Sequence, residues 1–308
     1  MRIVFMGTPE FAVPSLQALL DAGHEVAAAF TQPDKPKGRK QILTPSPVKV
    51  LAQERGIPVF QPGTLRSPDA EKLLSELAPD VIVVAAYGKI LPKAILELPQ
   101  YGCVNVHASL LPKYRGAAPI QWAIINGEEK AGVTTMQMAE GIDTGDMLLS
   151  ESTPIGPEEN AEELTARLAQ LGASLLVKTL EGLQEGKIVP IPQDDAQSCY
   201  VSMLSRELSP VDWSRTAAEI HNQVRGLFPW PAAETVCEGK RLKLFRTKIA
   251  ADQPGLAGTA SVYDGEFTVC CGNGTALKLL EVQPENGKRM NGKDFLRGHP
   301  AIDGTMLK

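Results

Sequence analysis

The sequence predicts an α/β protein with two domains: a doubly wound sheet with helices, followed by a small β-barrel or sandwich. Strand-like and helix-like segments alternate through the first 180 residues, the pattern of a mostly parallel sheet covered by helices. The last hundred or so residues form short strand-like runs separated by Gly and Asn turns. A length of 308 residues also suits two domains better than one.

The first domain is predicted from hydrophobic pattern and from helix start and stop signals. Residues 3–6 form a short apolar run, expected as a buried strand that ends at Gly7. Ser46 and Ser67 each precede a proline, which is the signature of a helix N-cap followed by proline at the first helical position. We expect further strands at 26–31, 81–84, 104–107 and 133–138, and helices at 14–22, 46–56, 67–77 and 161–182.

The character of the chain changes between residues 184 and 210, where prolines accompany the polar run Gln193-Asp194-Asp195 and periodicity is weak. We interpret residues 189–207 as a surface linker between a first domain, 1–188, and a second domain, 208–308. In the second domain we expect a helix at 214–226 and strands at 240–247, 259–263, 267–271 and 277–282.

Composition excludes several classes of protein. Hydrophobic residues make up 43 % and charged residues 22 % of the chain, an ordinary globular balance. The apolar runs are too short to span a bilayer and no signal-peptide pattern is present, so we expect a cytoplasmic protein that binds no membrane. The five cysteines form no CxxC pair, which favours buried, reduced thiols over a disulfide framework or a metal site.

The turn after the first strand argues against a dinucleotide cofactor. A dinucleotide-binding turn needs three glycines, so that the backbone can approach the pyrophosphate. Here Gly7 is followed by Thr8-Pro9-Glu10, which lacks the later glycines, and Pro9 has no amide hydrogen to donate. A nicotinamide or flavin cofactor is therefore not expected.

Two short stretches carry the residues suited to catalysis. Asn105 and His107 are two apart on a predicted strand, so their side chains point to the same face, near the end where open α/β sheets bind ligands. Asp143 lies between Gly141 and Gly145 in a tight loop that can bring its carboxylate to another site. An Asn donor, an imidazole and an orienting carboxylate together suit acyl transfer between nitrogen atoms. Taken singly, each residue also fits an ordinary structural position.

The motifs around these residues are similar to those of the 10-formyltetrahydrofolate-dependent formyltransferases. The resemblance extends along the whole chain, in the manner of the family members that act on tRNA. It rests on the motif Asn105-Val-His107-Ala-Ser-Leu-Leu-Pro112, on Arg115-Gly-Ala-Ala-Pro119, on Gly141-Ile-Asp143-Thr-Gly145, on Phe5-Met-Gly-Thr-Pro9, on Phe228-Pro-Trp230-Pro and on Asp294-Phe-Leu-Arg-Gly298.

This resemblance implies a fold, a co-substrate and a set of site residues. The fold is a Rossmann-like domain followed by an OB-like barrel, and the co-substrate is 10-formyltetrahydrofolate, with no metal. Asn105, His107 and Asp143 match the catalytic trio of the family. The residues expected to contact folate are Ser109, Leu110, Leu111 and Pro112 in one loop, Ile90, Leu91 and Pro92 in one wall of the pterin site, and Glu140 in the opposite wall.

The resemblance also implies the acceptor and the mechanism. The α-amine of methionine on initiator tRNA attacks the formyl carbon, Asn105 and His107 stabilise the oxyanion, and Asp143 orients His107. We expect the enzyme to be a monomer. The alternative is a formyltransferase that acts on a sugar-nucleotide amine, because such enzymes also carry a C-terminal domain.

A basic loop favours the tRNA acceptor. Between residues 32 and 49 the chain holds five cations and a single acid, Asp34. Such a loop suits a phosphate backbone, where bound cations displace counterions, although a plain solvated loop is the competing interpretation. The sequence Gln41-Ile42-Leu43 departs from the more basic family pattern. The residues expected to contact tRNA here are Lys35, Lys37, Arg39 and Lys40, and Lys49 completes the basic set.

A second basic set lies in the C-terminal domain. Arg241 and Lys243 are two apart on a predicted strand and would share one face. We interpret them as sequence-independent support for tRNA binding, with an ordinary charged surface as the competing interpretation.

Overall fold

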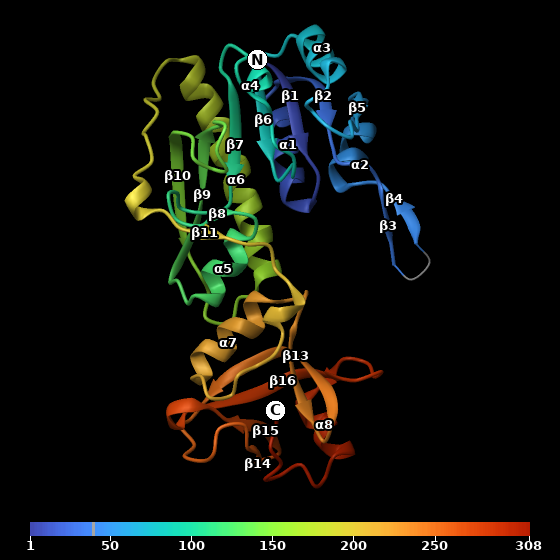
Figure 1. Ribbon diagram of the computed structural model, residues 1–308, viewed down its shortest axis with the longest axis vertical. Helices are drawn as coiled ribbons and strands as arrows, with labels where there is room; N and C mark the ends of the chain where they lie inside the picture. Colours follow the sequence, from blue (N-terminus) through green and yellow to red (C-terminus); the bar gives the residue numbers. More distant parts are fainter. Residues whose placement is uncertain (39–40) are drawn as a thin grey trace. The chain divides into compact units, whose positions relative to one another are not determined.

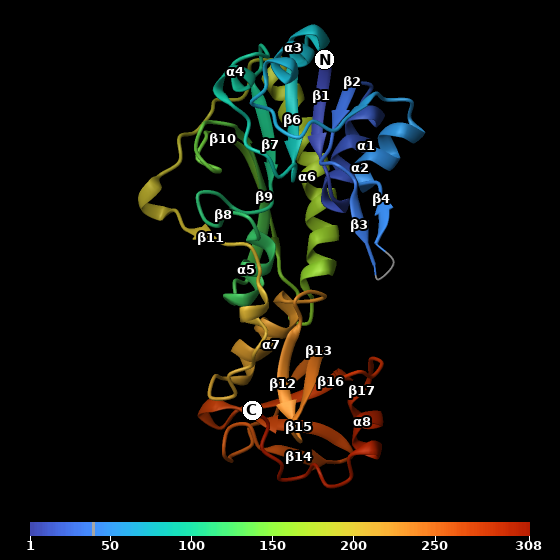
Figure 2. The ribbon, with the colours of Figure 1, turned by 45° about the vertical axis from the view of Figure 1, so that its right-hand side comes forward.

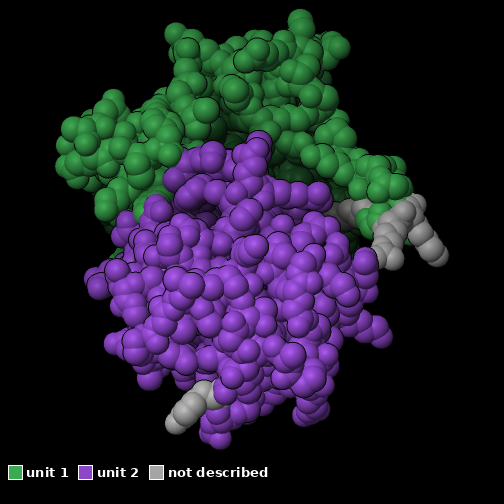
Figure 3. Space-filling model, turned by 60° about the horizontal axis from the view of Figure 1, so that its bottom comes forward, with its two compact units in different colours: residues 1–116, 131–153, 165–200 green, residues 117–130, 154–164, 201–308 purple. Residues whose placement is uncertain are grey.

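The computed structural model describes residues 1–38 and 41–308. The chain divides into two compact units (Figure 3). Unit 1 consists of residues 1–116, 131–153 and 165–200, and unit 2 of residues 117–130, 154–164 and 201–308.

Unit 1 is built on a seven-stranded sheet in the order β10-β9-β7-β6-β1-β2-β5 (Figure 1). β1 lies inside the sheet and pairs in parallel with β2 on one side and with β6 on the other. The strand order therefore reverses beside β1, which is where open α/β sheets bind ligands. The strands are β1 Arg2–Gly7, β2 Glu25–Phe30, β5 Val59–Phe60, β6 Val81–Ala85, β7 Cys103–His107, β9 Lys130–Gln137 and β10 Met147–Pro154.

The predicted helix starts in this unit are confirmed. The Ser46 hydroxyl accepts a hydrogen bond from the Lys49 amide, and the Ser67 hydroxyl accepts one from the Ala70 amide, as N-caps do. The long helix α6 lies along the sheet (Figure 2), where a Cβ added at Gly172 would meet the Val106 side chain of β7. The helices are α1 Val13–Asp21, α2 Pro47–Glu54, α3 Pro68–Leu77, α4 Lys93–Leu96 and α6 Ala161–Gln184.

Gly7 has a packing role at the end of β1. A Cβ at this position would lie 2.8 Å from the Ala12 Cβ and 3.0 Å from the Ala85 carbonyl oxygen of β6. The glycine therefore lets the turn after β1 pack closely against Ala12 and the end of β6.

The basic loop forms a hairpin that the strand predictions did not include. β3 Lys35–Lys37 and β4 Ile42–Thr44 pair antiparallel and extend away from the sheet (Figures 1 and 2). Ile42 and Leu43 are 62 % and 64 % exposed, so no apolar pattern marks these strands as half-buried.

Several other elements differ from the predictions. β10, the short helix α4 and the helix α5 Pro119–Ile125 were not predicted, and the helix expected at 214–226 begins later, as α7 Ala217–Gly226. Thr216 and Glu219 form a capping box at this helix start, and their reciprocal hydrogen bonds favour residue 216 over Ser214 as the N-cap. The remaining short pieces are the paired strands β8 Arg115–Gly116 and β11 Tyr200–Val201.

Unit 2 contains an antiparallel sheet in the order β12-β13-β16-β15-β14, with β17 paired to β16. The side chains of Trp213, Phe267 and Leu307 belong to its buried core. The four predicted strands are confirmed as β13, β14, β15 and β16, whereas the edge strand β12 was not predicted. The elements are β12 Ala233–Cys237, β13 Lys240–Ala250, β14 Ala260–Tyr263, β15 Glu266–Cys270, β16 Ala276–Pro284, β17 Met290–Asn291 and α8 Gly292–Gly298.

The last residues of the chain bind to both edge strands of this sheet. Lys308 exchanges backbone hydrogen bonds with Val236 of β12. On the other side, the Ala260 amide of β14 donates to the Thr305 carbonyl, and the Leu307 amide donates to the Gly258 carbonyl. The terminal segment thus satisfies backbone groups that edge strands otherwise leave unpaired.

The described part of the chain has neither a membrane-spanning helix nor a cluster of metal-binding side chains. Within residues 1–38 and 41–308, no helix is long and apolar enough to cross a membrane. The same residues contain no cluster of His, Cys, Asp and Glu side chains arranged to hold a metal ion. All five cysteines are free thiols, and Cys199 is the exposed one.

The terminal segment offers a test of the fold. Leu307 is 2 % exposed in the core of unit 2, whereas the neighbouring Met306 is 37 % exposed. We expect Leu307→Ala to lower the free energy of unfolding by about 2–4 kcal/mol, because it removes buried apolar surface and leaves a cavity. Denaturant unfolding followed by tryptophan fluorescence measures this, since Trp213 lies in the same core. Met306→Ala is the control, and an equal effect of both substitutions would contradict the assignment.

Candidate active site

Asn105 and His107 project from the same face of β7, as the sequence predicts. Between them, Val106 points to the opposite face, where it lies beside Gly172 of α6. Asn105 is half-buried and pairs in register with Val84 of β6, so it lies near the carboxyl ends of the central strands. His107 is buried, at 6 % exposed. The pair therefore lies on the face away from α6, at the edge of the sheet that favours ligand binding.

The His107 ring is held between a carbonyl and a carboxylate. Its Nε2 lies 2.9 Å from the Tyr114 carbonyl oxygen, and its Nδ1 lies 3.6 Å from Asp143 Oδ2. A carbonyl oxygen only accepts, so Nε2 carries a hydrogen and donates it to Tyr114. Nδ1 is therefore the nitrogen left for proton exchange, and protonating it produces an imidazolium that faces the carboxylate.

Asp143 is held by groups distant in sequence. Its Oδ2 accepts a hydrogen bond of 2.9 Å from the Gly116 amide. Its backbone has a φ of 52°, in the left-handed region that Asp tolerates better than most residues. The Gln193 amide donates to the carbonyl oxygens of both Asp143 and Gly145, at 2.9 and 2.7 Å. These hydrogen bonds hold the loop by its backbone, so the Asp143 side chain can face His107.

Arg115 and Gln193 support the site, although no role was predicted for either from the sequence. Arg115 is 2 % exposed, and its guanidinium donates to Gln193 Oε1, to the Tyr200 hydroxyl and to Asp195. A buried cation requires such partners. Two features of the sequence could have indicated their roles. Arg115 begins the motif Arg115-Gly-Ala-Ala-Pro119, and Gln193 begins the polar run in the predicted linker. The segment predicted as a surface linker is mostly exposed, yet it supplies these contacts.

The loop after β7 is fixed by internal hydrogen bonds. The Thr134 hydroxyl donates to the Ser109 carbonyl and accepts from the Leu111 amide, and the Ser109 hydroxyl donates to the Lys113 carbonyl. Ser109 and Leu111 are buried, while Leu110 and Pro112 are half-buried. The bond between Leu111 and Pro112 is cis.

The two predicted walls of the pterin site carry exposed apolar side chains. Ile90 and Ile142 are each 60 % exposed, so each presents apolar surface to solvent. Leu91 instead packs into the core of unit 1 and supports the wall from behind. Pro92 is half-buried and is the N-cap of α4, and Glu140 is exposed.

The predicted tRNA contacts lie in both units. Lys35 is exposed on the hairpin. Arg39, Lys40 and the side chain of Lys37 lie outside what the structure describes. In unit 2, Arg241 and Lys243 share the face of β13 opposite the buried Leu242 and Leu244, as predicted. Arg241 forms an exposed ion pair with Glu285, with an N–O distance of 3.5 Å.

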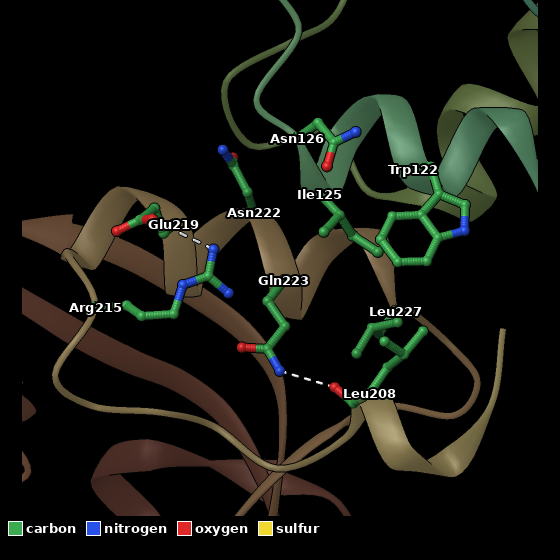
Figure 4. A pocket seen from close by; sticks show the side chains of 9 residues that line it. All are labelled: Trp122, Ile125, Asn126, Leu208, Arg215, Glu219, Asn222, Gln223 and Leu227. Carbon is green, nitrogen blue, oxygen red and sulfur yellow. Dashed lines mark hydrogen bonds and ion pairs between the residues drawn. The ribbon is translucent and has the colours of Figure 1, made fainter. Parts of the chain in front are cut away.

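A separate pocket of about 560 Å³ lies within unit 2 (Figure 4). Its lining includes Trp122 and Ile125 from α5 and Asn222 and Gln223 from α7, and Figure 4 shows the Gln223 amide nitrogen directed at the Leu208 carbonyl. None of the predicted catalytic or folate-binding residues lines this pocket. The constellation around His107 therefore remains the candidate active site.

The chain matches two models of known protein families. The family model described as formyl transferase matches residues 1–180, and the model of the formyl transferase C-terminal domain matches residues 203–300. The chain belongs to the formyl transferase family. A relative named methionyl-tRNA formyltransferase, from Trichlorobacter lovleyi, is 54 % identical over 308 residues, covering 99 % of this chain and 96 % of the relative. One of the same name from Citrifermentans bemidjiense is 52 % identical over 307 residues, covering 100 % and 96 %.

Among solved structures, the N-formyltransferase from Helicobacter canadensis in complex with folinic acid and dTDP-3-aminofucose has a similar fold. The TM-score is 0.69, with 21 % sequence identity, and the match covers 92 % of this chain and 99 % of that chain. At this level of identity the similarity concerns the fold alone.

Gln193 provides a test of how the formyl transferase site is held. We expect Gln193→Leu to lower kcat for formyl transfer by about tenfold to a hundredfold, because the loop that carries Asp143 loses its two backbone anchors. Steady-state kinetics measure this. Gln197→Leu is the matched control, since Gln197 is exposed and its amide binds Asp194 instead. Unchanged kcat in the Gln193 variant would show that the loop needs no such anchor.

Proposed function

We propose that this chain transfers the formyl group of 10-formyltetrahydrofolate to the free amino group of methionyl-initiator tRNA, giving N-formylmethionyl-tRNA for translation initiation. The observation that carries the proposal is the full-length similarity, above 50 % identity, to relatives named for this activity. The arrangement of His107 and Asp143 at the carboxyl end of β7 supports the same chemistry.

The proposed roles of the catalytic trio follow from the contacts of His107. In the reaction, the bond between the formyl carbon and the folate nitrogen breaks while a new amide forms at the amine of the acceptor. Asn105 and His107 donate to the oxyanion of the tetrahedral intermediate. With Nε2 bonded to Tyr114, His107 uses Nδ1 to give a proton to the folate nitrogen as its bond to the formyl carbon breaks, so that tetrahydrofolate leaves. Asp143, 3.6 Å from Nδ1, stabilises the charged ring and receives the amine proton through water.

The folate-binding residues stay a prediction with partial structural support. The exposed Ile90 suits contact with the flat, largely apolar faces of a pterin ring, and the exposed Glu140 lies two residues before the exposed Ile142. The rigid loop after β7 gives defined positions to backbone groups that can bind the ring edge. We propose Ser109, Leu110, Leu111, Pro112, Ile90, Leu91, Pro92 and Glu140 for this site.

For tRNA, we propose that the basic hairpin contacts the phosphate backbone of the acceptor stem. The hairpin extends from the sheet and exposes Lys35, which lets its cations approach a rod-like polyanion. We propose Lys35, Lys37, Arg39 and Lys40 here. Arg241 and Lys243 supply support from unit 2, where the exposed ion pair with Glu285 leaves Arg241 open to exchange that partner for a phosphate.

We further propose that the sheet of unit 2 closes into an OB-like barrel. The support is the terminal segment, which hydrogen-bonds to β12 and to β14, the two ends of the strand order. We retain the predicted division into a catalytic domain at 1–188, a linker at 189–207 and a C-terminal domain at 208–308. The family models match 1–180 and 203–300, which supports these limits. We also propose that the enzyme is a cytoplasmic monomer.

The acceptor assay tests the proposed function directly. The purified chain is incubated with labelled 10-formyltetrahydrofolate and either methionyl-initiator tRNA or a UDP-4-amino sugar. We expect label in the tRNA and none in the sugar nucleotide, because the extended basic hairpin suits a polyanion. Label in the sugar nucleotide alone would favour the alternative acceptor and reject the tRNA proposal.

Substitutions in the trio test the catalytic roles. We expect Asn105→Ala and His107→Ala each to reduce kcat by about 10²–10⁴-fold, since each removes oxyanion stabilisation or proton transfer. Equilibrium binding of tRNA and thermal unfolding serve as controls and are expected to change little. Near-normal turnover in both variants would place the chemistry elsewhere.

A further inference from the structure

Both ends of the basic hairpin meet in one cluster of side chains. Asp34 directly precedes β3, and Lys49 lies in the first turn of α2, shortly after β4. The Lys49 Nζ lies 2.7 Å from Asp34 Oδ2. This ion pair therefore joins the residue that enters the hairpin to the helix that follows it.

Gln61, which follows β5, completes the cluster. Its Oε1 accepts a hydrogen bond of 2.9 Å from Lys49 Nζ, and its Nε2 donates to Asp34 Oδ1 at 2.8 Å. The same nitrogen donates to the Gln32 carbonyl at 2.8 Å. Both carboxylate oxygens of Asp34 are thus engaged, and the hairpin base is tied to the end of the sheet.

The burial and charge of this cluster distinguish it from a surface ion pair. The side chains of Asp34 and Lys49 are each 18 % exposed, so solvent screens their attraction only weakly. A lysine in the first turn of a helix is opposed by the helix dipole, which favours acids there. The hydrogen bond from Lys49 holds the pKa of Asp34 below its ordinary value. Lys49 is therefore satisfied within the protein.

The cluster also connects with the predicted folate wall. The Gln32 side-chain amide donates to the carbonyl oxygens of Tyr87 and Gly88, at 3.1 and 2.9 Å. These two residues closely precede Ile90, which is proposed to contact the pterin. Gln32 thus binds Gln61 of the cluster through its backbone and the loop before Ile90 through its side chain.

We propose that Asp34, Lys49 and Gln61 form a clamp that sets the position of the basic hairpin, and that Lys49 is a positioning residue within it, not an RNA contact. A two-stranded hairpin without a packed face has little stability of its own, so its direction depends on how its base is held. This inference rests on the proposed tRNA-binding role of the hairpin.

In the kinetic test, a pure charge effect and a loss of positioning change the KM for tRNA in opposite directions. Asp34→Asn removes a negative charge near the hairpin, so electrostatics alone would lower the KM for tRNA. The clamp predicts the reverse: the KM for tRNA rises by about tenfold while kcat and the KM for folate stay within about twofold, because breaking a largely buried pair releases the hairpin base. Asp69→Asn, at an exposed acid of α3, is the matched control and leaves all constants unchanged.

The salt dependence of kcat/KM separates Lys49 from the exposed Lys35. Lys35→Met is expected to reduce the slope against log salt concentration by about one unit, the loss of one phosphate contact. Lys49→Met is expected to raise the KM for tRNA without changing the slope. A slope reduced equally by Lys49→Met, or a KM lowered by Asp34→Asn, would overturn the proposal.

Hydrogen exchange tests the clamp independently of the acceptor. In Asp34→Asn and Lys49→Met, the amides of Lys35, Lys37, Ile42 and Leu43 are expected to exchange about tenfold faster than in the unaltered chain, as an unclamped hairpin opens more often. Unchanged exchange would reject the clamp. If exchange accelerates but the chain formylates only a sugar nucleotide, the clamp stands and the proposed acceptor fails.

Discussion

The structure of the candidate site depends on the partners that a buried imidazole and its carboxylate require. His107 is almost fully buried, so each ring nitrogen needs a counterpart within the protein. The Tyr114 carbonyl and Asp143 supply them, and Asp143 in turn needs the Gly116 amide. This requirement brings together the end of β7, the strand β8 and the loop after β9.

The buried Arg115 also needs hydrogen-bond partners, and the segment after α6 supplies them. Arg115 is buried beside the site and draws on Gln193, Asp195 and Tyr200, while Gln193 also binds the backbone of the Asp143 loop. An exposed segment of the chain thereby stabilises the geometry of the half-buried Asp143 carboxylate. The seven-stranded sheet provides the rigid base, because its parallel strands β1, β2, β5, β6 and β7 end at one edge.

Charged side chains are arranged differently in the candidate site and on the hairpin. Around His107, the buried Arg115 and the half-buried Asp143 are held by hydrogen bonds that define their geometry in advance. On the hairpin, Lys35 is exposed, while the cation at the hairpin base, Lys49, is paired with Asp34. A hairpin that binds a polyanion needs exposed cations, and it also needs a fixed attachment to the sheet. The chain supplies both within fewer than twenty residues.

The sequence by itself determined the alternation of strands and helices in the first domain, the Ser-Pro helix starts and the shared face of Asn105 and His107. These follow from local patterns: side chains alternate along a strand, and N-caps form within a few residues. It also carried motifs specific enough to indicate formyl transfer. Only the tertiary structure decided that Gln193 holds the Asp143 loop, that Lys49 forms an ion pair with Asp34, and that the terminal segment hydrogen-bonds to both β12 and β14. These contacts join residues up to 73 positions apart, as between Thr235 and Lys308, and no local pattern encodes which distant partner a polar group will meet.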